Sequence, residues 1–186
     1  MKKSNFTFNR TEIILLLIPL SITSLKTKLI MKTASLKELK NELKNKSNDN
    51  MLELMLRLVK FKKDNKELLT YLLFESENED TFISDVKKQI DDEFSNINTN
   101  SLYLAKKTIR KVLRTTNKHI KYSGIKQTEV ELTIYFCKKI KDSEIPLQSS
   151  KALYNIYHRQ IDKLKVSISK LHEDLQYDYK MELEEM

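Results

Sequence analysis

Glycine is almost absent from this sequence, which has 1 glycine in 186 residues beside 2 prolines, 1 cysteine and no tryptophan. Dinucleotide-binding folds, P-loop NTPases and hydrolases of the G-x-S-x-G type each need several glycines at fixed positions in the turn that carries their chemistry. Small barrels and sandwiches need many turns with positive φ, which Gly, Asn and Asp mostly fill. The composition therefore excludes the glycine-dependent enzyme folds and favours an all-α protein.

The single cysteine, Cys137, excludes an internal disulfide and a cysteine-based zinc site, and it fits a reducing compartment. Hydrophobic residues make up 40% and charged residues 32% of the chain, which favours one soluble, cytoplasmic domain over a disordered chain or a membrane bundle. The 34 Lys and Arg exceed the 26 Asp and Glu and give a net charge of +8. Because the whole chain is rich in Lys and Asn, this excess alone identifies no partner.

Residues 1–30 differ from the rest of the chain. Basic residues precede an apolar run from Ile13 to Leu25, which Pro19 interrupts. The run is shorter than the roughly 17–25 residues of a transmembrane helix, so we expect no membrane anchor. It resembles a signal peptide without a good cleavage site, which leaves secretion open, and translation can also begin at Met31. We expect residues 1–30 to be an extension outside the fold, residues 31–180 to form one helical domain, and residues 181–186 to be an acidic tail.

Helical periodicity recurs along the rest of the chain and predicts a bundle of five to seven helices. Ser35 and Glu38 have capping-box spacing, and Gly124 lies where a left-handed C-terminal cap is needed. Residues 129–141 also alternate like a strand, but an isolated strand would have no partner in this chain, so a helix is favoured. The predicted helices span about 36–46, 52–61, 64–73, 78–97, 102–122, 129–141 and 150–180.

The last predicted helix, residues 150–180, carries a heptad seam. At 1.5 Å per residue it would be about 45 Å long and would be the longest in the chain. Two interpretations remain open: the seam packs along its own bundle, or it pairs with another subunit. The seam residues that we assign to an interaction are Tyr157, Ile161, Leu164, Ile168, Leu171 and Leu175.

The predicted helix at about 101–122 has a basic face opposite its apolar face. No acidic residue lies between Glu93 and Glu129. A row of cations can neutralise the phosphates of a nucleic acid, and Tyr103 and Tyr122, which flank the row, can stack on unpaired bases. Alternatively, the acidic helix at 78–97 can pair with the row in an antiparallel hairpin. The row falls within about 140° of arc and consists of Lys106, Lys107, Arg110, Lys111, Arg114, Lys118 and Lys121.

No group of residues has the spacing of a catalytic or metal site. His158 and Asp162 lie one helical turn apart, but the further ligands of a metal site are missing. Glu129 and Glu131 would face different directions on a helix, and Cys137 lies on an apolar stripe. We therefore expect no catalytic residues, no metal, no cofactor and no small-molecule substrate.

The chain contains the stretches Ser35-Leu-Lys-Glu-Leu-Lys40, Phe61-Lys-Lys-Asp-Asn-Lys-Glu-Leu-Leu-Thr-Tyr71 and Ala105-Lys-Lys-Thr-Ile-Arg-Lys-Val-Leu-Arg114. Together they resemble an uncharacterised family of small bacterial all-helical proteins that carry a domain of unknown function. The resemblance spans about residues 33–180 and leaves residues 1–30 outside. It implies a bacterial, cytoplasmic helical domain, and it implies no activity and no site residue.

These observations predict a non-enzymatic helical interaction module that self-associates or binds a protein partner through the heptad seam. The alternative is a protein that binds the phosphate backbone of a nucleic acid through the basic face at about 101–122. The two hypotheses differ in whether the acidic helix at 78–97 covers that face.

Overall fold

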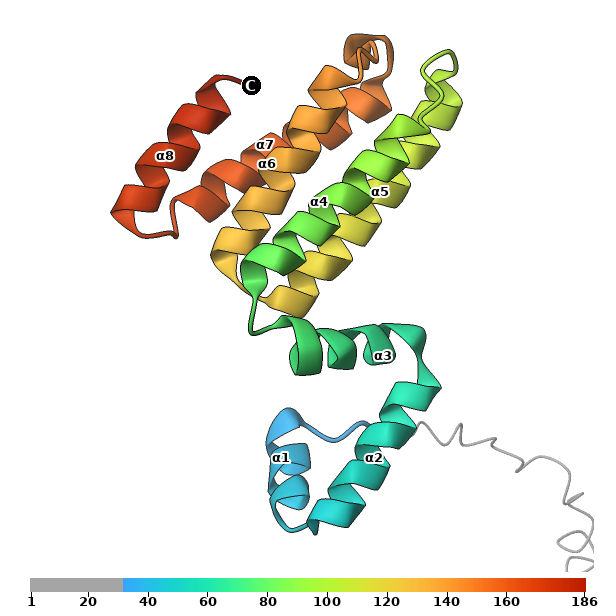
Figure 1. Cartoon of the computed structure of the whole chain (residues 1–186), viewed down its shortest axis with the longest axis vertical. Coiled ribbons are helices and arrows are strands. Elements are labelled where there is room, and N and C mark those ends of the chain that lie inside the picture. Colours follow the sequence, from blue (N-terminus) through green and yellow to red (C-terminus); the bar gives the residue numbers. More distant parts are fainter. Residues whose placement is uncertain (1–31) are drawn as a thin grey trace, which may run out of the picture. The chain divides into compact units, whose positions relative to one another are not determined.

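The computed structural model describes residues 32–186, so the expected extension at 1–30 lies outside the described residues. The described residues form eight α-helices and no strand, which confirms the all-α class (Figure 1). A π-helical turn, Tyr71–Glu75, follows α3, and a 3-10 turn, Leu147–Ser149, precedes α7. In chain order the helices are α1 (Leu36–Lys44), α2 (Asn48–Phe61), α3 (Lys63–Thr70), α4 (Glu79–Ser95), α5 (Leu102–Ser123), α6 (Lys126–Asp142), α7 (Lys151–Ile168) and α8 (Glu173–Glu184).

The chain divides into two units, residues 1–48 and 49–186. In the first unit, α1 begins at the predicted capping box. The Ser35 hydroxyl accepts the Glu38 backbone N–H at 3.3 Å, while the Glu38 carboxylate accepts the Ser35 backbone N–H at 2.7 Å. Two backbone donors that have no partner inside the helix are thereby satisfied.

The hydrophobic core of the second unit is shared by α4, α5, α6 and α7. Figure 1 shows α4 and α5 running antiparallel beside each other, with α6 against them. The central helix is α6, because α4, α5 and α7 all pack on it. Its buried positions are therefore spread around the helix and include Leu132 and Phe136 as well as Val130, Ile134 and Cys137. Burial on several sides explains why its sequence also alternates like a strand.

The C-terminal helix predicted over 150–180 is wrong in its length, because the structure breaks it at Ser169–His172 into α7 and α8. Two acidic residues, Glu173 and Asp174, occupy the first turn of α8, where negative charge favours a new helix start. After the break α8 packs back on the core, and Glu182 pairs with Lys138 of α6 at 2.7 Å. The residues expected to form an acidic tail, 181–186, thus include the last turn of α8. The split also gives eight helices instead of at most seven.

Candidate functional site

The basic face lies on α5, the longest α-helix among the described residues at 22 residues. Ser101 caps its first turn by accepting the Leu104 backbone N–H at 3.4 Å. The helix ends at Gly124, which adopts φ 68° and donates its backbone N–H to the Ile120 carbonyl at 2.9 Å. This left-handed cap confirms the role predicted for the glycine, since the conformation is strained for residues with a Cβ. One side of α5 is buried in the core, which turns its basic side outward.

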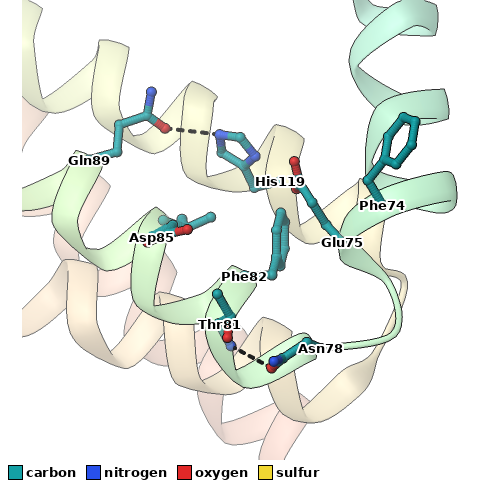
Figure 2. Close-up of a pocket in the computed structure, with 9 residues that line it drawn as sticks. Phe74, Glu75, Asn78, Thr81, Phe82, Asp85, Gln89 and His119 are labelled. Atoms are coloured by element: carbon teal, nitrogen blue, oxygen red, sulfur yellow. Dashed lines mark hydrogen bonds between the residues drawn. The ribbon is translucent and has the colours of Figure 1, made fainter.

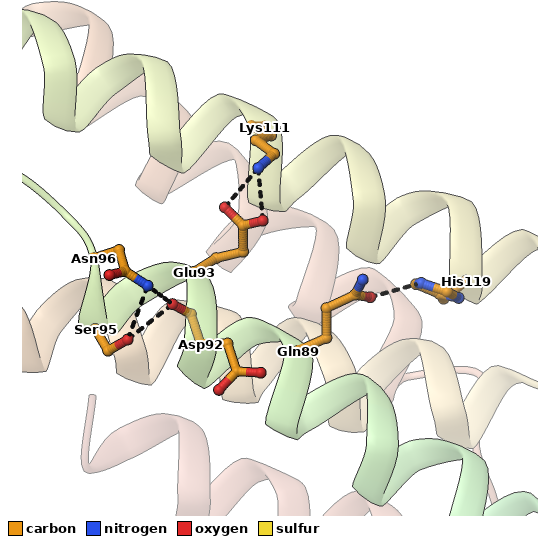
Figure 3. A network of polar contacts seen from close by, with 7 residues as sticks. All are labelled: Gln89, Asp92, Glu93, Ser95, Asn96, Lys111 and His119. Atoms are coloured by element: carbon orange, nitrogen blue, oxygen red, sulfur yellow. Dashed lines mark hydrogen bonds and ion pairs between the residues drawn. The ribbon is translucent and has the colours of Figure 1, made fainter.

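Two of the seven basic residues on this face are held by acidic partners. Lys111 pairs with Glu93 of α4 at 2.6 Å (Figure 3). Lys118 pairs with Glu67 of α3 at 2.5 Å, and the Tyr122 hydroxyl donates to the same carboxylate at 3.0 Å. The hydrogen bond from Lys118 is the main cause that lowers the pKa of Glu67 to about 2. Glu67 was not among the residues predicted for this face, because it comes from a helix distant in sequence.

The acidic helix α4 does not neutralise the rest of the face. Its residue Asp91 pairs instead with Lys139 of α6 at 2.7 Å and accepts the Tyr135 hydroxyl at 2.7 Å. Asp85 pairs with Lys88 on α4 itself at 2.8 Å. Of the α4 carboxylates, Glu93 alone forms an ion pair with α5 among residues 32–186. The hairpin of α4 and α5 therefore exists, but most of its charge is not balanced across it.

Four cations of α5 are exposed and have no acidic partner within the described chain. They fall within about 60° of arc and span about 21 Å along the helix. We call this set the open basic face: Lys107, Arg110, Arg114 and Lys121. The seventh residue, Lys106, is half-buried, and its Nζ atom lies 5.7 Å from the centre of the Tyr103 ring. Tyr103 is 70% exposed and can stack on a base, whereas Tyr122 is half-buried and hydrogen-bonded to Glu67.

A shallow pocket of about 520 Å³ lies at the C-terminal end of this face and is lined by Arg114, Lys118 and Lys121 with Asn117, Tyr122 and Asp64. Its lining brings together two cations of the open basic face and the edge of an aromatic ring. An anionic group that enters it meets more than one cation. The pocket thus continues the open basic face toward α3.

The heptad seam assigned to an interaction lies mostly in the protein's own core. Leu164 and Ile168 are both 1% exposed. Tyr157, Ile161 and Leu171 are half-buried against that core, and Leu175 is half-buried on α8. Of the two interpretations left open by the sequence, packing within the chain is the one that the structure shows for Leu164 and Ile168. These side chains are not available to a second subunit.

A different apolar surface is exposed, on α2. None of the 14 residues of this helix is buried, although most are apolar. Leu52 is 58% exposed, Leu58 61% and Phe61 85%. We call this surface the α2 apolar face: Met51, Leu52, Leu54, Met55, Leu56, Leu58, Val59 and Phe61. Helices of globular proteins bury such a stripe against another element, and within residues 32–186 this helix does not do so.

A second pocket, of about 410 Å³, opens between the turn Tyr71–Glu75, α4 and α5. Figure 2 shows Phe82 and His119 next to each other, with Phe74 and Glu75 on the turn beside them. His119 Nε2 lies 3.0 Å from Gln89 Oε1, and His119 Nδ1 is buried without a hydrogen-bond partner among residues 32–186. Burial, followed by the nearby positive charge of Lys118, lowers the pKa of His119. An amide cannot activate an imidazole as a carboxylate does, so this arrangement is not a catalytic pair.

The remaining candidate residues do not assemble into a reactive site. The His158 ring packs against Tyr154 and Tyr157, with ring centres 4.0 and 5.5 Å apart. Burial raises the pKa of the Cys137 thiol to about 12, so the nucleophilic thiolate is not formed near neutral pH. Glu129 is held by Lys126 and Lys163 at 2.6 and 3.0 Å. Within residues 32–186 no group of three or more His, Cys, Asp or Glu is placed to hold a metal ion.

One polar cluster joins four segments of the second unit. The Glu79 carboxylate at the start of α4 accepts hydroxyls from Tyr71 at 2.7 Å, Ser123 at 2.5 Å and Thr128 at 2.6 Å. Burial raises the pKa of Glu79, but the bonds from Ser123, Thr128 and Tyr71 outweigh it and the pKa is lowered overall. This cluster fixes the π-helical turn and the α5–α6 junction to α4, and thereby the base of the open basic face.

Comparison with known proteins gives no match: no family model, no curated protein and no solved structure is similar to this chain. The result agrees with the resemblance to an uncharacterised family, and no activity is transferred from another protein. No helix in the described part of the chain has the length and apolarity needed to cross a bilayer.

Proposed function

We propose that this chain is a non-enzymatic helical interaction module that binds another polypeptide helix through the α2 apolar face. One observation carries the proposal: of the eight apolar side chains of this helix, six are exposed and two, Met51 and Val59, are only half-buried. Large contiguous apolar patches are rare on monomeric proteins and mark interaction sites when they occur. A second amphipathic helix is the natural occupant, because it can lay its own apolar stripe along this face.

The proposal is tested by making the α2 apolar face polar. Leu52→Gln/Leu58→Gln changes two exposed leucines, and Val166→Gln/Met181→Gln is a matched control, since Val166 and Met181 are 55% and 48% exposed elsewhere. Each protein is examined for molar mass by light scattering and for binding of the apolar dye ANS, which reports exposed hydrophobic surface. If a partner helix occupies the face, we expect the α2 variant to lose association. If the face is open, we expect the variant to lose dye binding. The control should show neither change. If neither quantity changes, the proposal is wrong.

A second candidate function is binding of nucleic acid through its phosphate backbone. The observation in its favour is that Asp91 of α4 pairs with α6 and only Glu93 of α4 pairs with α5, which leaves the open basic face without acidic partners in the described chain. Four aligned cations match a row of phosphates, and Tyr103 adds an exposed ring beside them. Binding to single- and double-stranded oligonucleotides at low salt tests this candidate, with Arg110→Glu/Arg114→Glu as the variant that removes half of the face.

A further inference from the structure

The sequence of α2 is nearly symmetric about Met55, and this symmetry indicates which partner fits the α2 apolar face. Reading from Met55 toward either end gives a leucine, a charged residue, a leucine and an apolar residue. In the forward direction these are Leu56, Arg57, Leu58 and Val59; in the reverse direction they are Leu54, Glu53, Leu52 and Met51. The apolar pattern is therefore the same in both directions, and the two charges are opposite in sign.

A surface with this symmetry is complementary to a copy of itself. In a two-fold symmetric interface the same patch meets itself, so each residue must be compatible with its symmetry-related counterpart. We propose that the occupant of the α2 apolar face is the α2 helix of a second copy of this chain, packed antiparallel with the two-fold axis at Met55. This inference rests on the proposed function and names the partner of the same surface.

Antiparallel packing about Met55 makes the contacts of residues 51–59 apolar, while Phe61 lies outside this symmetric segment, at the height of Asp49 of the other copy. Each Met55 meets the Met55 of the other copy at the centre. Met51 and Leu52 at one end of the helix meet Leu58 and Val59 of the other copy. The flanking leucines, Leu54 and Leu56, meet leucines of the other copy on the two sides of the seam.

Charge does not oppose the antiparallel direction. Glu53 and Arg57 lie on the side of α2 opposite Met55, because two residues turn a helix by about 200°. Both charges therefore stay on the solvent side of the pair, and the direction of packing follows from the symmetry of the apolar positions.

The size of the surface sets the expected affinity. A helix of 14 residues is about 21 Å long, so a single pair of such helices falls short of the roughly 800 Å² per partner of a standard interface. Interfaces of this size give weak, reversible complexes. We therefore expect a dimer with a dissociation constant in the micromolar range, on the order of 1–100 µM.

The first measurement is the molar mass of the full chain by light scattering from about 1 to 200 µM, a range chosen to bracket this affinity. We expect a shift from monomer to dimer. Leu52→Gln/Leu58→Gln removes four leucines from each dimer and should weaken association at least about 100-fold, while Val166→Gln/Met181→Gln leaves it unchanged. Circular dichroism verifies that each variant retains its helical content, as expected when no buried residue is changed.

Cysteine cross-linking on the otherwise unchanged chain tests the direction of packing. The native Cys137 is buried and does not compete. Met55→Cys places two thiols at the symmetry axis and should give a disulfide-linked dimer on mild oxidation. Met51→Cys places them about 12 Å apart along an antiparallel pair, beyond the roughly 7 Å that a disulfide spans, and should not cross-link. Cross-linking of Met51→Cys as efficiently as Met55→Cys shows parallel packing and overturns the inference.

The outcomes separate this inference from the proposed function. A monomer at every concentration that binds ANS, and binds less of it after Leu52→Gln/Leu58→Gln, shows an open face whose partner is a different polypeptide. In that case self-association is wrong and the interaction module stands. A monomer without dye binding at α2, or a dimer insensitive to the α2 substitutions, overturns both.

Discussion

Reversing the charge of Arg110 and Arg114 is the perturbation that most directly tests the open basic face. Both side chains are exposed and neither has an acidic partner among the described residues, so Arg110→Glu/Arg114→Glu breaks no ion pair of the fold. The neighbouring Lys111 and Lys118 are unsuitable, since each forms an ion pair with another helix. A loss of binding in the double variant is therefore not caused by a loss of fold stability.

The expected magnitude follows from the number of unpaired cations. Each neutralised phosphate contributes about −0.9 to the slope of log affinity against log salt on duplex DNA, so four cations give about −3.6. Affinity should then fall about 150-fold between about 50 and 200 mM salt. The double variant retains two of the four cations and adds two carboxylates that repel phosphates, so its slope should be no steeper than about −1.8, a fall of at most about 12-fold over the same range. On single strands the wild-type slope is about −2.8.

Fluorescence anisotropy of labelled oligonucleotides, titrated at several salt concentrations, measures these slopes. The matched control is Lys165→Glu/Lys170→Glu, which makes the same change in net charge at two exposed lysines outside α5. We expect the control to keep the wild-type slope. The open basic face does not bind phosphates if the wild-type chain fails to bind at the lowest salt, or if the double variant and the control change the slope equally.

Three further changes test the fold that presents this face. Glu79→Ala leaves the buried Thr128 hydroxyl and two others without their acceptor, and chemical denaturation should show a loss of about 2–4 kcal/mol of unfolding free energy, against a smaller loss for Glu79→Gln. The pKa of His119 is lowered in the folded state, so the unfolded chain binds more protons below about pH 6.5. The free energy of unfolding therefore decreases as the pH is lowered through this range. In His119→Gln that part of the decline should disappear. Gly124→Ala meets no atom within 4 Å, so thermal denaturation should show only the backbone strain at φ 68°, about 1–2 kcal/mol.

The elements best predicted from the sequence are those whose signals are local. The capping box at Ser35 and the left-handed cap at Gly124 depend on residues three or four positions apart, and both are present as predicted. The break at Ser169–His172 was missed because the heptad spacing continues across it. It results from the return of α8 onto α6, where Glu182 meets Lys138, and no local pattern encodes that contact.

The candidate site was predictable in composition but not in accessibility. Periodicity placed all seven cations on one face of α5, yet only tertiary contacts decide which of them are paired. Glu67 reaches Lys118 across 51 positions of sequence, and Asp91 binds Lys139 and Tyr135 of α6 instead of α5. Similarly, the heptad seam and the α2 apolar face have equally apolar sequences. Which of the two is buried depends on the packing of α6.

Both proposed surfaces have features that lower the stability of the folded chain or contribute nothing to it. Like charges three and four residues apart, such as Arg110 with Lys107 and with Arg114, destabilise a helix by about 0.2–0.5 kcal/mol for each pair. An apolar helix face left in water forgoes the free energy of burial, about 25 cal/mol for each Å². A bound partner of opposite charge removes the repulsion between like charges, and a bound apolar helix buries the exposed apolar face.

The residues concerned belong to different helices and share no contact partner. The effects of Arg110→Glu/Arg114→Glu and Leu52→Gln/Leu58→Gln should therefore be additive in a combined variant. Departure from additivity in oligonucleotide binding would mean that the dimer, not the single chain, is the form that binds.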